Sequence, residues 1–253
     1  MDRAATALLG SICHAAGRWY GEGYAAAMRD WEALTALAEE SQALSAVLLD
    51  LEADQFQRPT NCPPWNLKEL VVHTAASIGL HDDSASPEPG APLHSAADYY
   101  RRPQRATPQY RGRNVAQAQD LAARLPKGMT AAGMFEQVWQ ETVAKLRAQD
   151  PDRHIQVPAV GAMRLGDWTV TRVISVAAHG VDVALTLVRV PWTTSSALTV
   201  MRGVFLSLLG AELPQRLAWD DQLLLEAATG RRALTDQDRM HLGPLQERFP
   251  LLS

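Results

Sequence analysis

The segment from Trp168 to Val188 constrains the fold of this chain more than any other. Its side chains are apolar around almost the whole circumference of a helix, which leaves little surface for water. We therefore expect a long, buried helix around which other elements pack. The apolar positions are Val170, Val173, Ile174, Val176, Ala177, Ala178, Val181, Val183, Ala184, Leu185, Leu187 and Val188.

A single polar stripe interrupts this apolar surface. Its members are spaced three, four, three and four residues apart, so a helix stacks them on one side. Because burial of an unpaired ionisable group is costly, they must pair with each other, hold a metal or face a hydrated cavity. A structural alternative stays open, in which they only complete hydrogen-bond networks of the core. The stripe consists of Arg172, Ser175, His179, Asp182 and Thr186.

Three earlier segments have the spacing of amphipathic helices. They cover residues 31 to 51, 67 to 78 and 134 to 146. With the buried helix they predict an all-α fold built on a four-helix bundle, in which ligand and metal sites commonly lie between facing helices. No strand pattern is evident.

Two helix starts and one facing residue follow from this pattern. Asn66 followed by Glu69 resembles a capping arrangement, and Asp167 is the expected cap of the buried helix. The helix that follows Asn66 carries His73 at the edge of its apolar face. We expect His73 and His179 to converge from different helices.

The chain divides into three predicted regions. Residues 1 to 28 form an N-terminal extension, residues 29 to 190 the helical bundle, and residues 191 to 253 a C-terminal region of further helices. Within the bundle, residues 81 to 113 are rich in proline and predict a long excursion with one short helix near Tyr99.

Charge and composition narrow the function classes. The formal net charge of −4 gives no reason to bind nucleic acid, which requires clustered cations. The two cysteines lie far apart, so a reduced, cytoplasmic protein is expected. The N-terminus lacks a convincing export signal, and we expect no membrane span and no membrane partner. A small-molecule substrate is the remaining partner, and the oligomeric state is open.

Several motifs together resemble a known family. They make the chain similar to the DinB-like superfamily, in the branch named after mycothiol-dependent maleylpyruvate isomerase, and this resemblance implies a DinB-like four-helix bundle. The motifs are Leu51-Glu-Ala-Asp-Gln-Phe56, Pro59-Thr-Asn-Cys-Pro-Pro-Trp65, Leu67-Lys-Glu-Leu-Val-Val-His73, Arg172-Val-Ile-Ser-Val-Ala-Ala-His179-Gly-Val-Asp182, Ala228-Thr-Gly-Arg231 and Phe249-Pro-Leu-Leu252.

The resemblance also implies a divalent metal, usually zinc, held by His73 and His179. The third ligand in the family is commonly a Glu four residues before the second histidine, and this chain has Ser175 there. A neutral hydroxyl is a poor zinc ligand. Either Asp182 supplies the missing carboxylate, or the site has lost its metal and kept its pocket.

The implied chemistry is addition of a low-molecular-weight thiol to an electrophile, with mycothiol as the expected thiol in an actinobacterial setting. In this scheme Arg172 orients the substrate or pairs with Asp182, and Ser175 hydrogen-bonds water or substrate. Tyr99 contacts the substrate or belongs to a solvated loop. Arg231 anchors a substrate carboxylate or caps a helix end.

Three functions therefore compete. The leading hypothesis is a metal-assisted, thiol-dependent transferase or isomerase that acts on a small electrophilic metabolite. The second is a metal-free descendant that uses the pocket for another reaction, such as a cyclisation in specialised metabolism, and Ser175 favours it. The third is a non-catalytic binding or resistance protein.

Overall fold

The computed structural model describes residues 31–80 and 86–252. The predicted extension, residues 1 to 28, lies outside these ranges. The chain separates into two compact units, Met1–Glu32 and Ala33–Ser253. The sheet and the cavity described below belong to the second unit, as do the described helices apart from Glu32. Because that unit runs on to the C-terminus, the predicted boundary near residue 190 remains a prediction.

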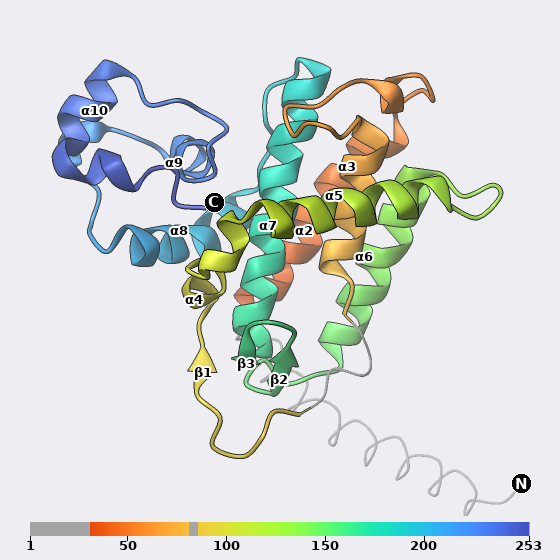
Figure 1. Cartoon of the computed structure of the whole chain (residues 1–253), viewed down its shortest axis with the longest axis horizontal. Helices are drawn as coiled ribbons and strands as arrows, with labels where there is room; N and C mark the ends of the chain where they lie inside the picture. Colours follow the sequence, from red (N-terminus) through yellow and green to blue (C-terminus); the bar gives the residue numbers. More distant parts are fainter. Residues whose placement is uncertain (1–30, 81–85, 253) are drawn as a thin grey trace, which may run out of the picture. The chain divides into compact units, whose positions relative to one another are not determined.

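The described part of the chain is mainly helical (Figure 1), which confirms the predicted helical class. Further helices follow residue 190, as the sequence predicts. The DinB-like bundle type remains a prediction. The helices are α2 (Glu32–Leu49), α3 (Leu67–Ile78), α4 (Ala96–Tyr100), α5 (Pro108–Ala123), α6 (Ala131–Arg147), α7 (Leu165–Leu187), α8 (Ser195–Leu209), α9 (Asp221–Ala228) and α10 (Asp236–Leu242).

Helix α3 lies at the centre of the helical packing, against α5, α6 and α7. The Ser45 hydroxyl of α2 donates to the Glu136 carboxylate of α6 and joins those two helices. Large apolar side chains fill the space between the helices, among them Leu37, Leu44, Leu70, Phe135, Leu146 and Ile174. Burial of such side chains supplies the main driving force for folding, about 1.5–3 kcal/mol each.

The start of α3 is fixed by its capping residues, as the sequence predicts. The Asn66 side chain accepts a hydrogen bond from the backbone N–H of Glu69, and the Glu69 carboxylate accepts from the backbone N–H of Asn66. This reciprocal pair satisfies two backbone donors that the helix itself cannot. It sets the register of α3 and hence the position of His73.

Helix α7 is the buried helix that the sequence predicts. Among the described helices, α7 is the one that is long and apolar enough to cross a membrane by length and composition alone. However, 72% of its most apolar 18-residue stretch is buried inside the protein, as in a core helix. The expected cap at Asp167 is wrong. The helix begins at Leu165, and the Asp167 carboxylate instead accepts the backbone N–H of Ala96, which ties α4 to the first turn of α7.

A small three-stranded sheet corrects the all-α prediction. Strand β3 (Gly161–Arg164) lies between β1 (Leu93–His94), which is parallel to it, and β2 (His154–Val157), which is antiparallel. Figure 1 shows this sheet beside the N-terminal end of α7. At two to four residues, the strands are too short for an alternating pattern to stand out. The turn between β2 and β3 forms one wall of the cavity described next.

The prediction of a long excursion over residues 81 to 113 needs a second correction. Its short helix near Tyr99 is confirmed as α4, but α5 begins at Pro108, inside the excursion. Pro108 occupies the first turn of α5, where a proline is tolerated because its missing N–H is not needed. Thr107 caps the helix through the backbone N–H of Tyr110. Helix α5 covers one side of the cavity.

Candidate functional site

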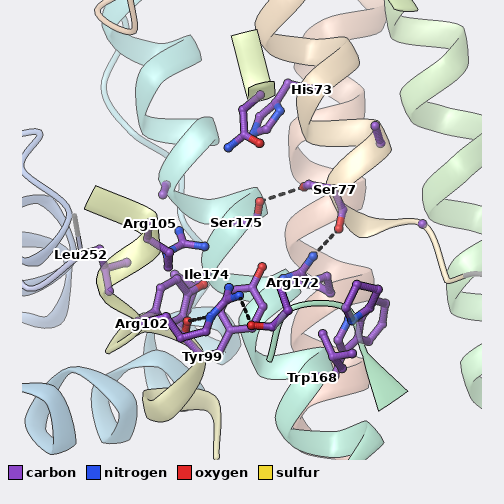
Figure 2. Close-up of a pocket in the computed structure, with 18 of the residues that line it drawn as sticks. His73, Ser77, Tyr99, Arg102, Arg105, Trp168, Arg172, Ile174, Ser175 and Leu252 are labelled. Carbon is purple, nitrogen blue, oxygen red and sulfur yellow. Dashed lines mark hydrogen bonds between the residues drawn. The ribbon is translucent and has the colours of Figure 1, made fainter. Parts of the chain in front are cut away.

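A cavity of about 470 Å³ lies between α3, α4, α5, the β2–β3 turn and α7. This volume falls in the range of small-molecule sites. Figure 2 shows His73 at one end, Tyr99, Arg172 and Trp168 at the other, and Ser175 between them. Every residue predicted for the site except Asp182 lines the cavity: His73, Tyr99, Arg172, Ser175, His179 and Arg231.

The two histidines meet at one end of the cavity. Their ring centroids lie 5.3 Å apart in an edge-to-face arrangement, and the His73 ring also stacks on Trp65 at 4.5 Å. Burial, together with the nearby His179, Arg172 and Arg105, lowers the pKa of His73 to about 3. His73 is therefore neutral at physiological pH and able to accept a hydrogen bond or bind a metal.

Asp182 orients His179 and also accepts hydrogen bonds from Asn61 and Arg231. One carboxylate oxygen accepts the Asn61 amide at 2.8 Å and Arg231 Nε at 3.0 Å, while the other accepts Arg231 Nη2 at 2.6 Å and lies 2.9 Å from His179 Nδ1. Burial raises the pKa of Asp182, but the hydrogen bonds and charges of His179 and Arg231 hold it below its ordinary range.

An ionised carboxylate can only accept hydrogen bonds, so His179 Nδ1 carries the proton and Nε2 is left as the acceptor. This is how a histidine ligand or base is held in one tautomer. The alternative pairing of Arg172 with Asp182 is wrong, because Asp182 pairs with Arg231. The sequence leaves Arg231 as either a substrate anchor or a helix cap. The helix-cap alternative fits one contact, because the Arg231 side chain donates to the Thr229 carbonyl at the end of α9.

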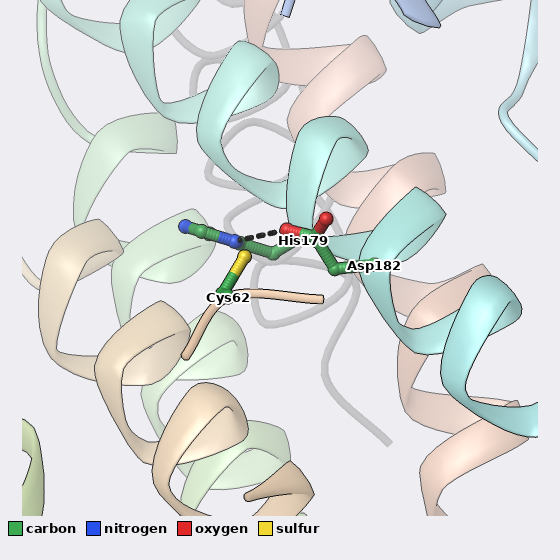
Figure 3. Close-up of side chains that lie close together, drawn as sticks. All are labelled: Cys62, His179 and Asp182. Atoms are coloured by element: carbon green, nitrogen blue, oxygen red, sulfur yellow. Dashed lines mark hydrogen bonds and ion pairs between the residues drawn. The ribbon is translucent and has the colours of Figure 1, made fainter. Parts of the chain in front are cut away.

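Cys62 lies close to His179 and Asp182, a proximity that the sequence did not reveal. One ligand atom each from Cys62, His179 and Asp182 lies within 4.8 Å of the others, so the three form a group that could hold a metal ion (Figure 3). Without an ion, burial and the adjacent Asp182 raise the pKa of the Cys62 thiol to about 12. The thiol then donates to Asp182 and is not a nucleophile. Its position in the loop before α3 gave the only signal.

Ser175 closes the space between α3 and α7. Its hydroxyl lies 2.9 Å from the Ser77 hydroxyl, and the Ser77 carbonyl accepts a hydrogen bond from the Arg172 guanidinium. Arg172 is buried and also donates from Nε to the Thr171 hydroxyl at 3.1 Å. Ser175 thus stands where the family it resembles commonly has a carboxylate, and its hydroxyl pairs with that of Ser77.

The fold and site define a mainly helical protein with a polar cavity built around two histidines and a fixed carboxylate. The family described as the mycothiol maleylpyruvate isomerase N-terminal domain matches residues 37–184, more than half of the chain. The chain belongs to this family. No curated protein and no solved structure matches it.

Proposed function

We propose that the chain is a transferase or isomerase of small-molecule metabolism that uses a low-molecular-weight thiol, such as mycothiol, in the cavity between α3 and α7. The observation that carries this proposal is the His179–Asp182 pair beside His73, because it fixes the orientation of an imidazole at the wall of a ligand-sized cavity. A cytoplasmic location, with neither nucleic-acid nor membrane partners, completes the proposal.

The donor set is suited to a divalent metal, and zinc in particular. A thiolate, an imidazole and a carboxylate are the ligand types that zinc accepts, and three protein ligands leave a fourth position open. Cys62, His179 and Asp182 would hold the ion. When bound, zinc lowers the pKa of a thiol and polarises a carbonyl.

The remaining cavity residues have roles that need no metal. His73 is neutral and offers a hydrogen-bond acceptor to the thiol or the substrate. The Ser175 hydroxyl offers a hydrogen bond to substrate or water. Arg172, held by its bonds to Ser77 and Thr171, orients the substrate. Asp182 positions His179 through Nδ1.

A metal-free reaction in the same cavity is the second candidate, and two contacts favour it. Ser175 pairs with Ser77 where the family commonly has a carboxylate, and both oxygens of Asp182 already accept hydrogen bonds, Arg231 bonding to each of them. Such a descendant would catalyse another small-molecule reaction, such as a cyclisation.

Metal content of the untagged protein, measured by elemental mass spectrometry, separates the two candidates. Near-stoichiometric zinc that is lost in His179→Ala and Cys62→Ser, but kept in the exposed control His154→Ala, supports the metal site. A parallel His73→Ala variant tests whether His73 is a further ligand. A metal-free wild type favours the second candidate.

Thiol-dependent conversion of an electrophile tests the reaction itself. The protein is incubated with mycothiol and a panel of electrophilic carbonyl compounds, and both the loss of free thiol (transferase) and the thiol-dependent isomerisation of the carbonyl compound (isomerase) are followed with time. Turnover that disappears in His179→Ala, while that variant keeps its helical circular dichroism, supports the proposal. Ligand binding without any turnover across the panel would instead indicate a non-catalytic binding protein.

A further inference from the structure

Three arginines surround one tyrosine at the end of the cavity away from His73. The guanidinium carbons of Arg102, Arg105 and Arg172 lie 4.6, 5.2 and 5.1 Å from the centroid of the Tyr99 ring. All four side chains line the cavity. Three cations at this spacing repel one another unless nearby negative charge offsets them.

Within the described ranges, no carboxylate supplies that charge. Arg102 donates to the carbonyls of Tyr99 and Ala159, and Arg105 donates to the Tyr110 hydroxyl. The partners of Arg172 are neutral as well. No Asp or Glu lines the described wall of the cavity.

Other arginines of the chain do have acidic partners. Arg101, in the same segment, pairs with Asp98 at 3.0 Å, and Arg231 pairs with Asp182. The arginines around Tyr99 differ from these two, because their hydrogen-bond partners within the described ranges are all neutral. In addition, Arg105 Nε is buried without a hydrogen-bond partner. A buried unpaired donor on a cation is costly, and a bound anion would satisfy it.

The electrostatic field of the cluster reaches the other groups of the cavity. Arg172 first, and then Arg105 and Arg102, lower the pKa of the Tyr99 hydroxyl to about 8 despite its burial. Apolar side chains form much of the remaining wall, namely Leu80, Ile155, Val157, Pro158, Trp168 and Ile174, together with the neutral polar side chains of Asn114, Gln117 and Gln156. The cavity thus has a cationic end and a histidine end, with Ser175 between them (Figure 2).

We propose that Arg102, Arg105 and Arg172 bind the carboxylate of an apolar organic acid, so that the remainder of the acid extends along the apolar wall toward His73 and His179. Arginine matches a planar carboxylate through paired N–H donors. This inference rests on the proposed function, since it assigns the substrate class of the same cavity.

Isothermal titration with two probes of equal shape tests the proposal. The acid is 2-naphthoate, and its neutral counterpart is 2-naphthamide. The variant is Arg105→Gln, and the matched control is Arg124→Gln, whose side chain is 76% exposed and pairs only with Asp120. Circular dichroism checks that both variants fold. We expect naphthoate to bind at least tenfold more tightly than naphthamide.

We expect Arg105→Gln to weaken naphthoate binding roughly 10- to 100-fold, the usual effect of losing a charged hydrogen bond. Naphthamide binding and the Arg124→Gln control should change less than twofold. Equal binding of acid and amide, or no binding of the acid, overturns the proposal. So does acid binding that survives Arg105→Gln but is abolished by a chelator, because the carboxylate would then sit on a metal.

This experiment needs neither thiol, metal nor turnover. A protein that binds naphthoate through Arg105, but neither consumes thiol nor isomerises any electrophile in a thiol-dependent way, refutes the proposed function and leaves the carboxylate site standing. The reverse result, turnover without Arg105-dependent binding, refutes the carboxylate site alone.

Discussion

Asp182→Asn should destabilise the protein far more than a typical loss of one ion pair. The substitution keeps the size of the side chain but removes the charge that Arg231 faces. The Asp182 side chain is 0% exposed and that of Arg231 only 15% exposed, so the variant strands a guanidinium in the interior. Breaking a buried pair in this way costs about 3–5 kcal/mol. The exposed pair of Arg124 and Asp120 sets the contrast, because exposed pairs contribute about 0–1 kcal/mol.

Urea unfolding followed by helical circular dichroism measures the effect at pH 7, with a chelator present so that a bound metal contributes nothing. The free energies of unfolding of Asp182→Asn, Arg231→Gln and the double variant form a cycle, and Asp120→Asn is the control. We expect the double variant to lose less stability than the two single variants together, since it no longer buries a lone charge. Additive losses, or a loss below about 1 kcal/mol in Asp182→Asn, would refute the reasoning.

Three further predictions concern titration and helix capping. The pKa of His73 is about 3 in the fold and 6.5 ordinarily, so the unfolded chain takes up a proton first. The free energy of unfolding should therefore fall as the pH drops from 6.5 toward 3, by at most about 1.4 kcal/mol per pH unit. Urea unfolding of His73→Gln should show a shallower fall with pH, and an unchanged slope contradicts this. Ultraviolet titration should show one tyrosinate forming near pH 8. That step should vanish in Tyr99→Phe, and its persistence would assign it to another tyrosine. Asn66→Ala should cost about 1 kcal/mol in urea unfolding through loss of the α3 cap, whereas a neutral result would mean that tertiary packing alone fixes the helix start.

Long periodic segments of the sequence were sufficient to predict the helical class and α7. Helix α7 is buried over most of its length because nearly all its side chains are apolar, which a sequence reveals directly. The capping pair at Asn66 was equally readable, since its residues are neighbours in sequence. The sheet and α5 were missed. The strands are very short, and α5 is largely polar, with few buried residues to give a periodic signal.

The site was predictable as a set of residues but not as a set of contacts. The stripe on α7 and the position of His73 follow from helical spacing. The partners of Asp182 do not, because Asn61 and Arg231 reach it from segments far away in the sequence. The same applies to Cys62, because it lies far away in sequence from His179 and Asp182, which it approaches in the fold. Pairing across distant segments depends on tertiary structure that no local pattern encodes.

The ion pair of Asp182 and Arg231 limits which sequences can replace the C-terminal part of the chain. The family match ends at residue 184, so Asp182 lies inside the matched segment and its counter-ion Arg231 lies beyond it. Leu252, near the end of the chain, also lines the cavity. A recombination event that replaced the C-terminal region would leave a buried carboxylate uncompensated unless the incoming sequence carried an equivalent cation. The segment beyond the family match is therefore needed to neutralise a charge that lies inside it.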